Sequence, residues 1–159
     1  MSVYLIKQKI FKITDHFPIC REDGSTAFYL NQKFNMLKYH AVLEGPNSEP
    51  ICEIQEKVLA WLNTFEIKFS NGQNMVMKQK LNLFHRNFDI EGSFGKIELK
   101  GSFSDFDFSV YYEGEKIAEI SRKFLTVRDQ FRVETYQERF DVMVIAICLC
   151  LDKNLDKSY

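Results

Sequence analysis

The sequence predicts a mainly β protein, a closed antiparallel barrel of about 12 strands around a central hydrophobic C-terminal α-helix. Three observations lead to this prediction: a repeat of 21 to 24 residues, turn-forming residues between the repeat units, and an apolar run near the C-terminus. The chain has 159 residues, of which 45% are apolar and 27% charged, as in soluble domains with a sizeable core. We therefore expect a single domain over residues 1–159, with strands over about 3–134 and the helix over about 136–154.

The repeat unit is a short apolar and polar pattern that contains a lysine. The pattern is an apolar residue, two variable residues, a lysine in five of the six units, and an apolar residue. The units begin at Ile6, Leu30, Ile54, Met77, Leu99 and Ile120. In four units a phenylalanine follows eight residues after the lysine, and an isoleucine or valine follows two residues later. Apolar residues two apart indicate a strand with one buried face. Each unit therefore predicts two strands.

Turn-forming residues separate the units. They are EDGS, EGPNS, SNGQ, EGSFG and EGE, at residues 22–25, 44–48, 70–73, 91–95 and 113–115. Glycine supplies the positive φ that tight antiparallel hairpins need. Two strands cannot bury their own apolar face, so each unit must continue into its neighbours. A propeller has about four strands per blade. One continuous sheet therefore fits better, and its closure removes the sheet edges.

The segment RFDVMVIAICLCLDKNL, Arg139–Leu155, predicts the helix. Thr135 and Glu138 have the spacing of a capping box, so we expect the helix to begin at Tyr136 with Thr135 as its N-cap. The middle of the helix is apolar on all sides, which is typical of a helix buried in a protein core or in lipid. The side chains that we expect to form this core are Phe140, Val142, Met143, Val144, Ile145, Ile147, Leu149 and Leu151.

The length of the apolar run favours burial in the protein. The positions from Phe140 to Leu151, interrupted by Asp141, span about 18 Å, and the hydrocarbon core of a membrane is about 30 Å thick. Eight strands make a barrel that its own side chains fill, whereas about 12 leave room for a helix. We therefore expect the helix to fill the barrel and no transmembrane span. Insertion of this helix into a membrane is the alternative.

Two segments resemble a known family. YLIKQKIFKITDHFPI and EISRKFLTVRDQFRVE, with the six hairpin units and the terminal helix, resemble the LURP-one-related family, including its small bacterial members. This family belongs to the Tubby C-terminal-like and phospholipid scramblase-like superfamily. The resemblance extends over Val3 to Leu151 and implies a twelve-stranded barrel around a central hydrophobic helix. Tubby-like domains bind phosphoinositides and scramblases act on phospholipids, so the resemblance also implies a non-enzymatic binding module with an anionic phospholipid as its ligand.

The charge balance limits the expected partners. The net charge is −1, from 21 basic and 22 acidic residues, which gives no overall attraction to nucleic acid. An anionic phospholipid or a protein partner is therefore expected, and no nucleic acid. If the partner is a protein, the chain is a soluble scaffold or regulatory protein without a lipid role. We expect a monomer in the cytoplasm, where an anionic headgroup would be met peripherally at the inner membrane surface. The N-terminus lacks the layout of a signal peptide.

Two groups of basic residues are candidate anion sites. The first is the cluster Arg122, Lys123, Arg128 and Arg132. Asp129 lies within it, so an ordinary solvated surface of mixed charge is the alternative. The second group is the repeat lysines Lys9, Lys33, Lys57, Lys80 and Lys123. They could hold a headgroup, or they could be outward strand residues whose alkyl stems cover the sheet.

The sequence contains no motif that predicts catalysis. It has no nucleophile elbow, HExxH segment, phosphate loop or dinucleotide fingerprint, so we expect neither an enzyme nor a cofactor. Asp105 and Asp107 alternate with phenylalanine and could be paired carboxylates or the polar side of a strand. His16 and His40 occupy equivalent polar positions of two units. The four cysteines are expected to be reduced and buried, and no metal site is predicted.

Overall fold

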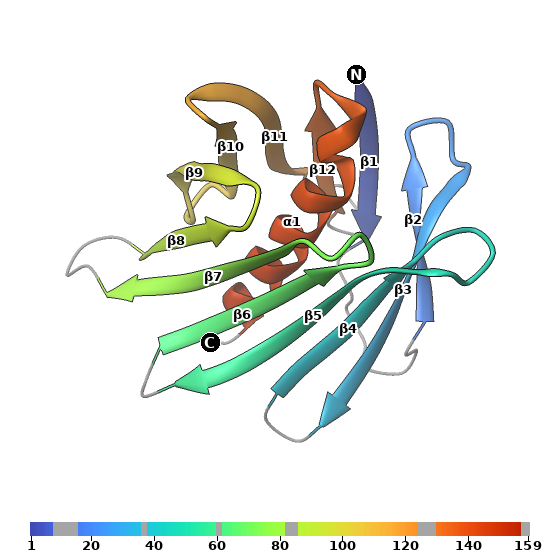
Figure 1. Ribbon diagram of the computed structural model, residues 1–159. Helices are drawn as coiled ribbons and strands as arrows, with labels where there is room; N and C mark the ends of the chain where they lie inside the picture. The colour runs from blue at the N-terminus through green and yellow to red at the C-terminus, as the bar shows by residue number, and fades with distance from the viewer. Residues whose placement is uncertain (8–15, 36–37, 60–61, 82–85, 124–129, 157–159) are drawn as a thin grey trace.

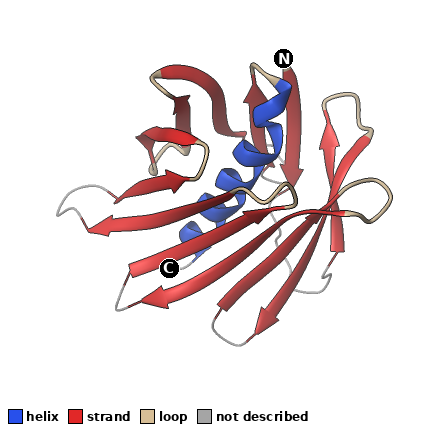
Figure 2. Ribbon diagram, in the orientation of Figure 1, coloured by secondary structure: helices blue, strands red, loops and turns tan. Residues whose placement is uncertain are grey.

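The computed structural model describes residues 1–7, 16–35, 38–59, 62–81, 86–123 and 130–156. These residues form twelve strands and one helical segment at the C-terminal end (Figure 2). The strands are β1 (Ser2–Lys7), β2 (His16–Arg21), β3 (Thr26–Asn35), β4 (Lys38–Glu44), β5 (Pro50–Leu59), β6 (Leu62–Phe69), β7 (Asn74–Leu81), β8 (Arg86–Gly92), β9 (Gly95–Ser102), β10 (Asp107–Tyr112), β11 (Glu115–Lys123) and β12 (Gln130–Thr135). The helical segment consists of the 3-10 turn η1 (Glu138–Phe140) and the helix α1 (Asp141–Asp156).

The strands form a closed antiparallel barrel, as predicted. Each strand pairs with the next one along the chain, and β1 pairs with β12 from Ser2↔Thr135 to Lys7↔Gln130, which closes the sheet. The six repeat starts lie in the odd-numbered strands β1, β3, β5, β7, β9 and β11, and the Phe-x-Ile or Phe-x-Val segments lie in even-numbered strands. The alternation also sets the faces of the sheet. In β12, for example, Phe131, Val133 and Thr135 are buried, whereas the residues between them are half-exposed.

The apolar helix fills the barrel, which confirms the central prediction (Figure 1). Seven of the eight predicted core side chains are buried: Phe140, Met143, Val144, Ile145, Ile147, Leu149 and Leu151. Val142 is partly buried and packs against the same core. Burial of a large apolar side chain contributes roughly 1.5–3 kcal/mol relative to exposure, so this helix supplies much of the stabilisation of the barrel. None of the described helices is long and apolar enough to cross a membrane.

The start of the helix differs from the prediction. Thr135 is not an N-cap but the last residue of β12, and its buried hydroxyl donates a hydrogen bond to the carboxylate of Asp141. The next residue, Tyr136, continues the strand contact because its N–H donates to the carbonyl of Ile117 at 2.9 Å. Gln137 then precedes the 3-10 turn without a side-chain cap. Thr135 is therefore paired in the sheet and does not cap the helix. Helical structure begins at residue 138 and ends at residue 156.

Asp141 anchors the beginning of α1 in the barrel wall. Its carboxylate is buried and accepts hydrogen bonds from the hydroxyls of Thr135 and Tyr4. Burial, followed by the hydrogen bond to Asp141, raises the pKa of Tyr4 to about 12. A buried carboxylate is stable in a protein when it has such partners. The helix is therefore joined through one side chain to both strands that close the barrel, β1 and β12.

The predicted turns connect the hairpin units, with one difference in detail. Gly24, Gly72 and Gly114 have positive φ, as tight hairpins require. In the segment EGPNS the residue with positive φ is Ser48 and not the glycine. The carboxylate of Glu49 folds over the glycine there, Gly45, so that a Cβ atom at this position would lie 1.9 Å from Oε1 of Glu49 and would displace this side chain. All these turns follow even-numbered strands, so they lie at the same end of the barrel as the start of the helix.

Candidate ligand-binding site

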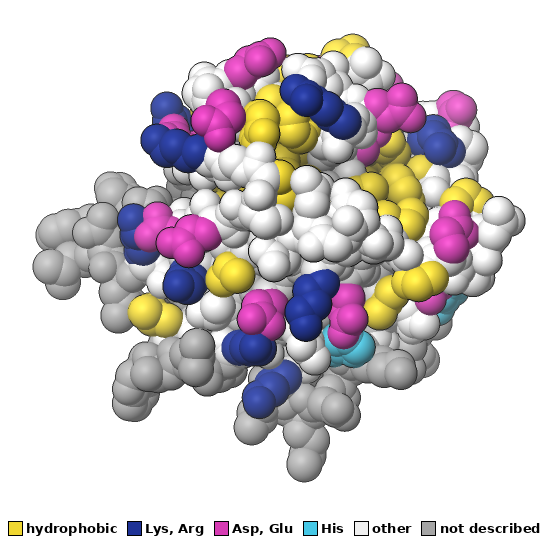
Figure 3. Space-filling model, in the orientation of Figure 1, with side chains coloured by type: hydrophobic (Ala, Val, Ile, Leu, Met, Phe, Trp, Pro, Cys, Tyr) yellow, Lys and Arg dark blue, Asp and Glu magenta, His cyan; other side chains and the backbone are white. Residues whose placement is uncertain are grey.

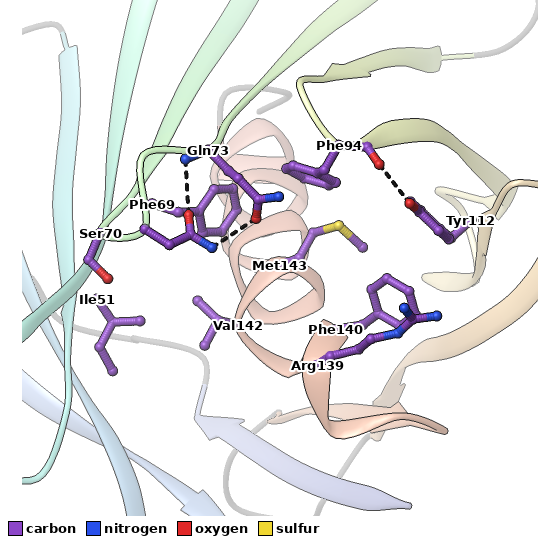
Figure 4. A pocket seen from close by; sticks show the side chains of 11 residues that line it. Ile51, Phe69, Ser70, Gln73, Phe94, Tyr112, Arg139, Phe140, Val142 and Met143 are labelled. Atoms are coloured by element: carbon purple, nitrogen blue, oxygen red, sulfur yellow. Dashed lines mark hydrogen bonds between the residues drawn. The ribbon is translucent and has the colours of Figure 1, made fainter.

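A cavity of about 400 Å³ opens at the end of the barrel where α1 begins (Figure 4). It is lined by Ile51, Phe69, Ser70, Asn71, Gln73, Phe94, Tyr112, Arg139, Phe140, Val142 and Met143. These residues come from β5, the β6–β7 and β8–β9 turns, the end of β10, and the first turns of the helical segment. Pockets that bind small molecules usually measure about 300–1,000 Å³, so the cavity has the size of a small-ligand site.

The inner wall of the cavity is apolar. The rings of Phe69 and Phe94 meet edge to face with their centroids 5.8 Å apart. The rings of Tyr112 and Phe140 lie 4.9 Å apart. The side chain of Met143 points into the cavity and is only 5% exposed. These side chains would remove the apolar part of a ligand from water, and the flexible thioether of methionine can adapt to its shape.

Gly95 fixes the position of one wall. Its φ is +144°, and a Cβ atom there would lie 2.7 Å from the ring of Tyr112 and 2.7 Å from Oε1 of Glu113. The missing side chain lets Tyr112 fold over the β8–β9 turn, where its hydroxyl donates to the carbonyl of Phe94 at 2.6 Å. The glycine at the end of EGSFG is thus a requirement of both the turn and the cavity wall.

The rim of the cavity carries polar groups from the β6–β7 turn. The backbone N–H of Gln73 donates to Oδ1 of Asn71 at 2.9 Å, and Nδ2 of Asn71 donates to Oε1 of Gln73 at 2.8 Å. The first bond orients the Asn71 side chain, and the second holds the Gln73 amide against it (Figure 4). Its Nε2 group has no hydrogen-bond partner among the described residues, so this donor is available to a ligand.

Arg139 supplies the charge at the rim. Its Nε donates to Oε1 of Gln137 at 2.9 Å, and its guanidinium carbon lies 4.5 Å from the ring centre of Phe140 and 6.0 Å from that of Tyr112. Within the described part of the chain, Arg139 has no acidic partner and its two terminal nitrogens make no hydrogen bond. It is also the only charged residue among the described residues that line the cavity. The site therefore combines an apolar interior with one cation that forms no direct ion pair among the described residues.

The predicted basic cluster is not a single surface in the described residues. Arg122 pairs with Phe131 across β11 and β12, and Arg132 pairs with Ser121, so the two arginines lie on opposite faces of the sheet. Arg132 also forms an ion pair with Glu134. Arg128 and the side chain of Lys123 lie outside the described residues. The structure therefore does not bring Arg122 and Arg132 together, and it leaves the other two members unplaced.

The repeat lysines whose side chains are described point outward and pair with acids. Lys57 lies 2.8 Å from Glu66, and Lys80 lies 2.6 Å from Asp89. The hydrogen bond from Lys57 lowers the pKa of the Glu66 carboxyl below its ordinary value. Lys9 and the side chains of Lys33 and Lys123 lie outside the described residues. Figure 3 shows basic and acidic side chains intermixed on this face, as expected for a solvated outer surface.

The structure does not bring His16, His40, Asp105 and Asp107 together into a metal or catalytic site. His40 contacts Glu53 at 2.8 Å, and His16 stacks on Tyr29 with a ring separation of 4.9 Å. The described residues contain no group of three or more His, Cys, Asp or Glu side chains that could hold a metal ion. Asp105 lies in a turn before β10 and Asp107 is the first residue of that strand, so the predicted strand does not include both.

The cysteines are free thiols. Cys52, Cys148 and Cys150 are buried, whereas Cys20 is only half-buried. Burial raises the pKa of the Cys52 thiol to about 12 and that of the Cys148 and Cys150 thiols well above the ordinary value. Such thiols stay protonated and unreactive near neutral pH, so they act as small apolar core residues.

Sequence reasoning alone did not single out the cavity residues. Arg139 was visible only as the start of the apolar run, and Gln73 only as part of a turn. One signal was available: the turns SNGQ and EGSFG and the start of the helix all follow even-numbered strands. In a closed barrel of consecutive hairpins these segments must meet at one end. The spacing in the sequence does not show which side chains turn toward the cavity.

The barrel and its cavity define a class of protein. A twelve-stranded closed barrel that is filled by one apolar C-terminal helix is the fold of the Tubby C-terminal-like type. The family model described as LURP-one-related matches residues 2–152, and the chain belongs to the LURP-one-related family.

A solved structure agrees with this assignment at the level of the fold. An X-ray structure of a protein from Arabidopsis thaliana superimposes with a TM-score of 0.63 and 18% sequence identity, over 98% of this chain and 91% of that one. A search of curated proteins gave no match. The family and the fold support a non-enzymatic binding module.

Proposed function

We propose that this protein binds an anionic lipid at the end of the barrel where the helix begins. The anionic group lies against Arg139, and the adjoining apolar part enters the cavity. The observation that carries the proposal is the position of Arg139, an arginine without an acidic partner among the described residues, at the rim of an apolar cavity of about 400 Å³. In this role the protein is cytoplasmic and contacts the inner membrane surface peripherally.

The chemistry of the rim supports an anion. A guanidinium presents paired N–H groups that match a carboxylate or phosphate, and such charge-assisted hydrogen bonds are stronger than neutral ones. The whole protein carries a net charge of −1, so attraction to an anionic surface has to be local. An apolar cavity next to a single cation matches the junction between the headgroup and the acyl chain of a lipid.

Vesicle flotation tests this function. We expect the purified protein to float with phosphatidylcholine vesicles that contain phosphatidylglycerol, and not with phosphatidylcholine alone. Retention should weaken from low to physiological salt, because salt screens exposed charges. Arg139→Gln should reduce retention several-fold.

Arg21 provides a matched control. It is also an arginine that forms no direct ion pair among the described residues, and its side chain donates hydrogen bonds only to Ser25 and Thr26. It does not line the cavity. Arg21→Gln removes the same charge and should leave retention unchanged. Equal retention by neutral and anionic vesicles, or equal loss in both variants, would refute the proposal.

The basic cluster is a second candidate contact for the same headgroups. A variant with Lys123→Gln and Arg128→Gln tests it, because both members of the Arg132–Glu134 ion pair stay in place. If this variant loses retention while Arg139→Gln keeps it, the cluster and not the cavity contacts the lipid. If no vesicle retains the protein at all, a protein partner becomes the better explanation of the binding fold.

A further inference from the structure

We infer that the cavity accommodates a single-chain anionic amphiphile of the fatty-acid type, taken up as a monomer. Its carboxylate lies against Arg139, and its chain lies against Met143. This inference rests on the proposed function and deepens it, because it names the class of ligand. A fatty acid differs from a phospholipid in a bilayer in that the whole molecule enters the site.

The volume of the cavity has room for one chain. At about 30 Å³ for each water-sized group, a cavity of about 400 Å³ holds roughly 13 such groups. That is the bulk of a carboxylate with a chain of about ten carbons. A second acyl chain of the same length would exceed the space.

The polar groups of the rim offer hydrogen-bond donors to an anionic head. The two free terminal nitrogens of Arg139 come from η1, and the free Nε2 of Gln73 comes from the β6–β7 turn. Both side chains are already held in place, Arg139 by its Gln137 bond and the rings, and Gln73 by Asn71. Donors that are fixed before binding lose little conformational freedom when a ligand arrives.

The interior of the cavity matches an alkyl chain. Phe69, Phe94, Val142 and Met143 present carbon and sulfur to the space, and the acidic side chains of the described residues do not line it. In the view of Figure 4 the side chain of Met143 lies between Gln73 and Arg139. A chain whose head lies against Arg139 therefore runs onto the apolar wall. A neutral or cationic head would leave the charge of Arg139 unpaired beside it.

Isothermal titration calorimetry with sodium decanoate, below the concentration at which it forms micelles, tests the inference. We expect saturable binding with one site per protein. Arg139→Gln should weaken binding about tenfold, the size expected for loss of a charge-assisted hydrogen bond. Arg139→Lys should weaken it less, because the charge remains and the paired geometry is lost.

Three further measurements make the titration specific. Decan-1-ol should bind more weakly than decanoate and should not respond to Arg139→Gln. Arg21→Gln should bind decanoate like the unchanged protein. Val142→Phe places a larger side chain in the cavity and should abolish decanoate binding, while thermal unfolding followed by circular dichroism verifies that this variant is folded.

The possible outcomes separate this inference from the proposed function. If the protein floats with anionic vesicles in an Arg139-dependent way but does not bind decanoate, the inference is wrong and the proposed function stands. If neither binds, both are wrong. Equal decanoate binding by the Arg139→Gln and unchanged proteins, or by the Val142→Phe variant, would also overturn the inference, since the chain would then lie elsewhere.

Discussion

Arg139 is held in place by aromatic rings and is not neutralised by a carboxylate of the described residues. Its guanidinium lies 4.5 Å from the Phe140 ring centre, a contact worth about 0.5–1 kcal/mol at an exposed site. Arg132 shows the contrasting case, because its charge is paired with Glu134 on the outer face. Nothing in the sequence around the two arginines distinguishes them. Only their neighbours in the fold pair Arg132 with a carboxylate and leave Arg139 without a direct ion pair among the described residues.

Gly95 is the residue on which the cavity wall depends most directly. Gly95→Ala should lower the free energy of unfolding by about 2–4 kcal/mol, because it adds strain at positive φ and pushes the Tyr112 ring away. Urea unfolding measures this loss. Decanoate binding should weaken in the same variant, since Tyr112 forms part of the wall.

Gly24 separates the two causes of this loss. It also has positive φ, but a Cβ atom there would meet nothing within 4 Å. Gly24→Ala should therefore cost only about 1 kcal/mol, from the backbone alone. If Gly95→Ala cost no more than Gly24→Ala, Tyr112 would not be held by the close approach that the structure shows.

The types of individual residues predicted the candidate site less well than any other part of the molecule. Arg122 and Arg132 are close in the sequence, and both are basic, so they were interpreted as one surface. The register of β11 and β12 places them on opposite faces. The residue types alone do not fix that register. A shift of one residue in a strand exchanges its two faces.

At the scale of elements, the sequence predicted much more. The repeat predicted the strands because a unit of 21 to 24 residues, with two strands and a turn, recurs six times. The apolar positions of every unit have to meet the same core. The helix followed from its apolar residues on all sides. The error lay at its start, where the Thr135 and Glu138 spacing suggested a cap. Local pairing with β11 keeps the chain extended through Thr135, and Asp141 then anchors the helix.

The helix is the core of the barrel, and one substitution tests this. Ile145→Asp should unfold the protein, with a loss above about 4 kcal/mol, because it places a carboxylate without partners at a fully buried position. Circular dichroism and urea unfolding measure the effect. A folded Ile145→Asp variant with the stability of the unchanged protein would show that the helix is not the core.

Val142→Asp is the matched control for this test. The same type of change is made on the same helix, but Val142 is only half-buried and faces the cavity. The new carboxylate can reach water there, and it lies near the cation of Arg139. We expect this variant to fold and to lose less than about half as much stability as Ile145→Asp.

At the scale of the whole molecule, closure of the barrel creates the cavity. Pairing of β1 with β12 brings the β6–β7 and β8–β9 turns to the same end as η1 and the start of α1. Asn71, Phe94 and Arg139, which are far apart in the sequence, thereby line one space. The sequence predicted the barrel and the helix that fills it. It did not predict that the helix leaves a cavity at this end of the barrel.

Methyl NMR of protein labelled with [methyl-13C]methionine tests the central claim most directly. Met143 lines the cavity, whereas Met75 and Met77 are fully buried in the barrel wall and do not line it. The Met143 signal is assigned from its loss in Met143→Leu. On addition of decanoate we expect the Met143 methyl to shift and to saturate at one ligand per protein, while Met75 and Met77 change little. No shift of Met143 at saturating decanoate, or equal shifts of all three, would contradict a ligand site at the start of the helix.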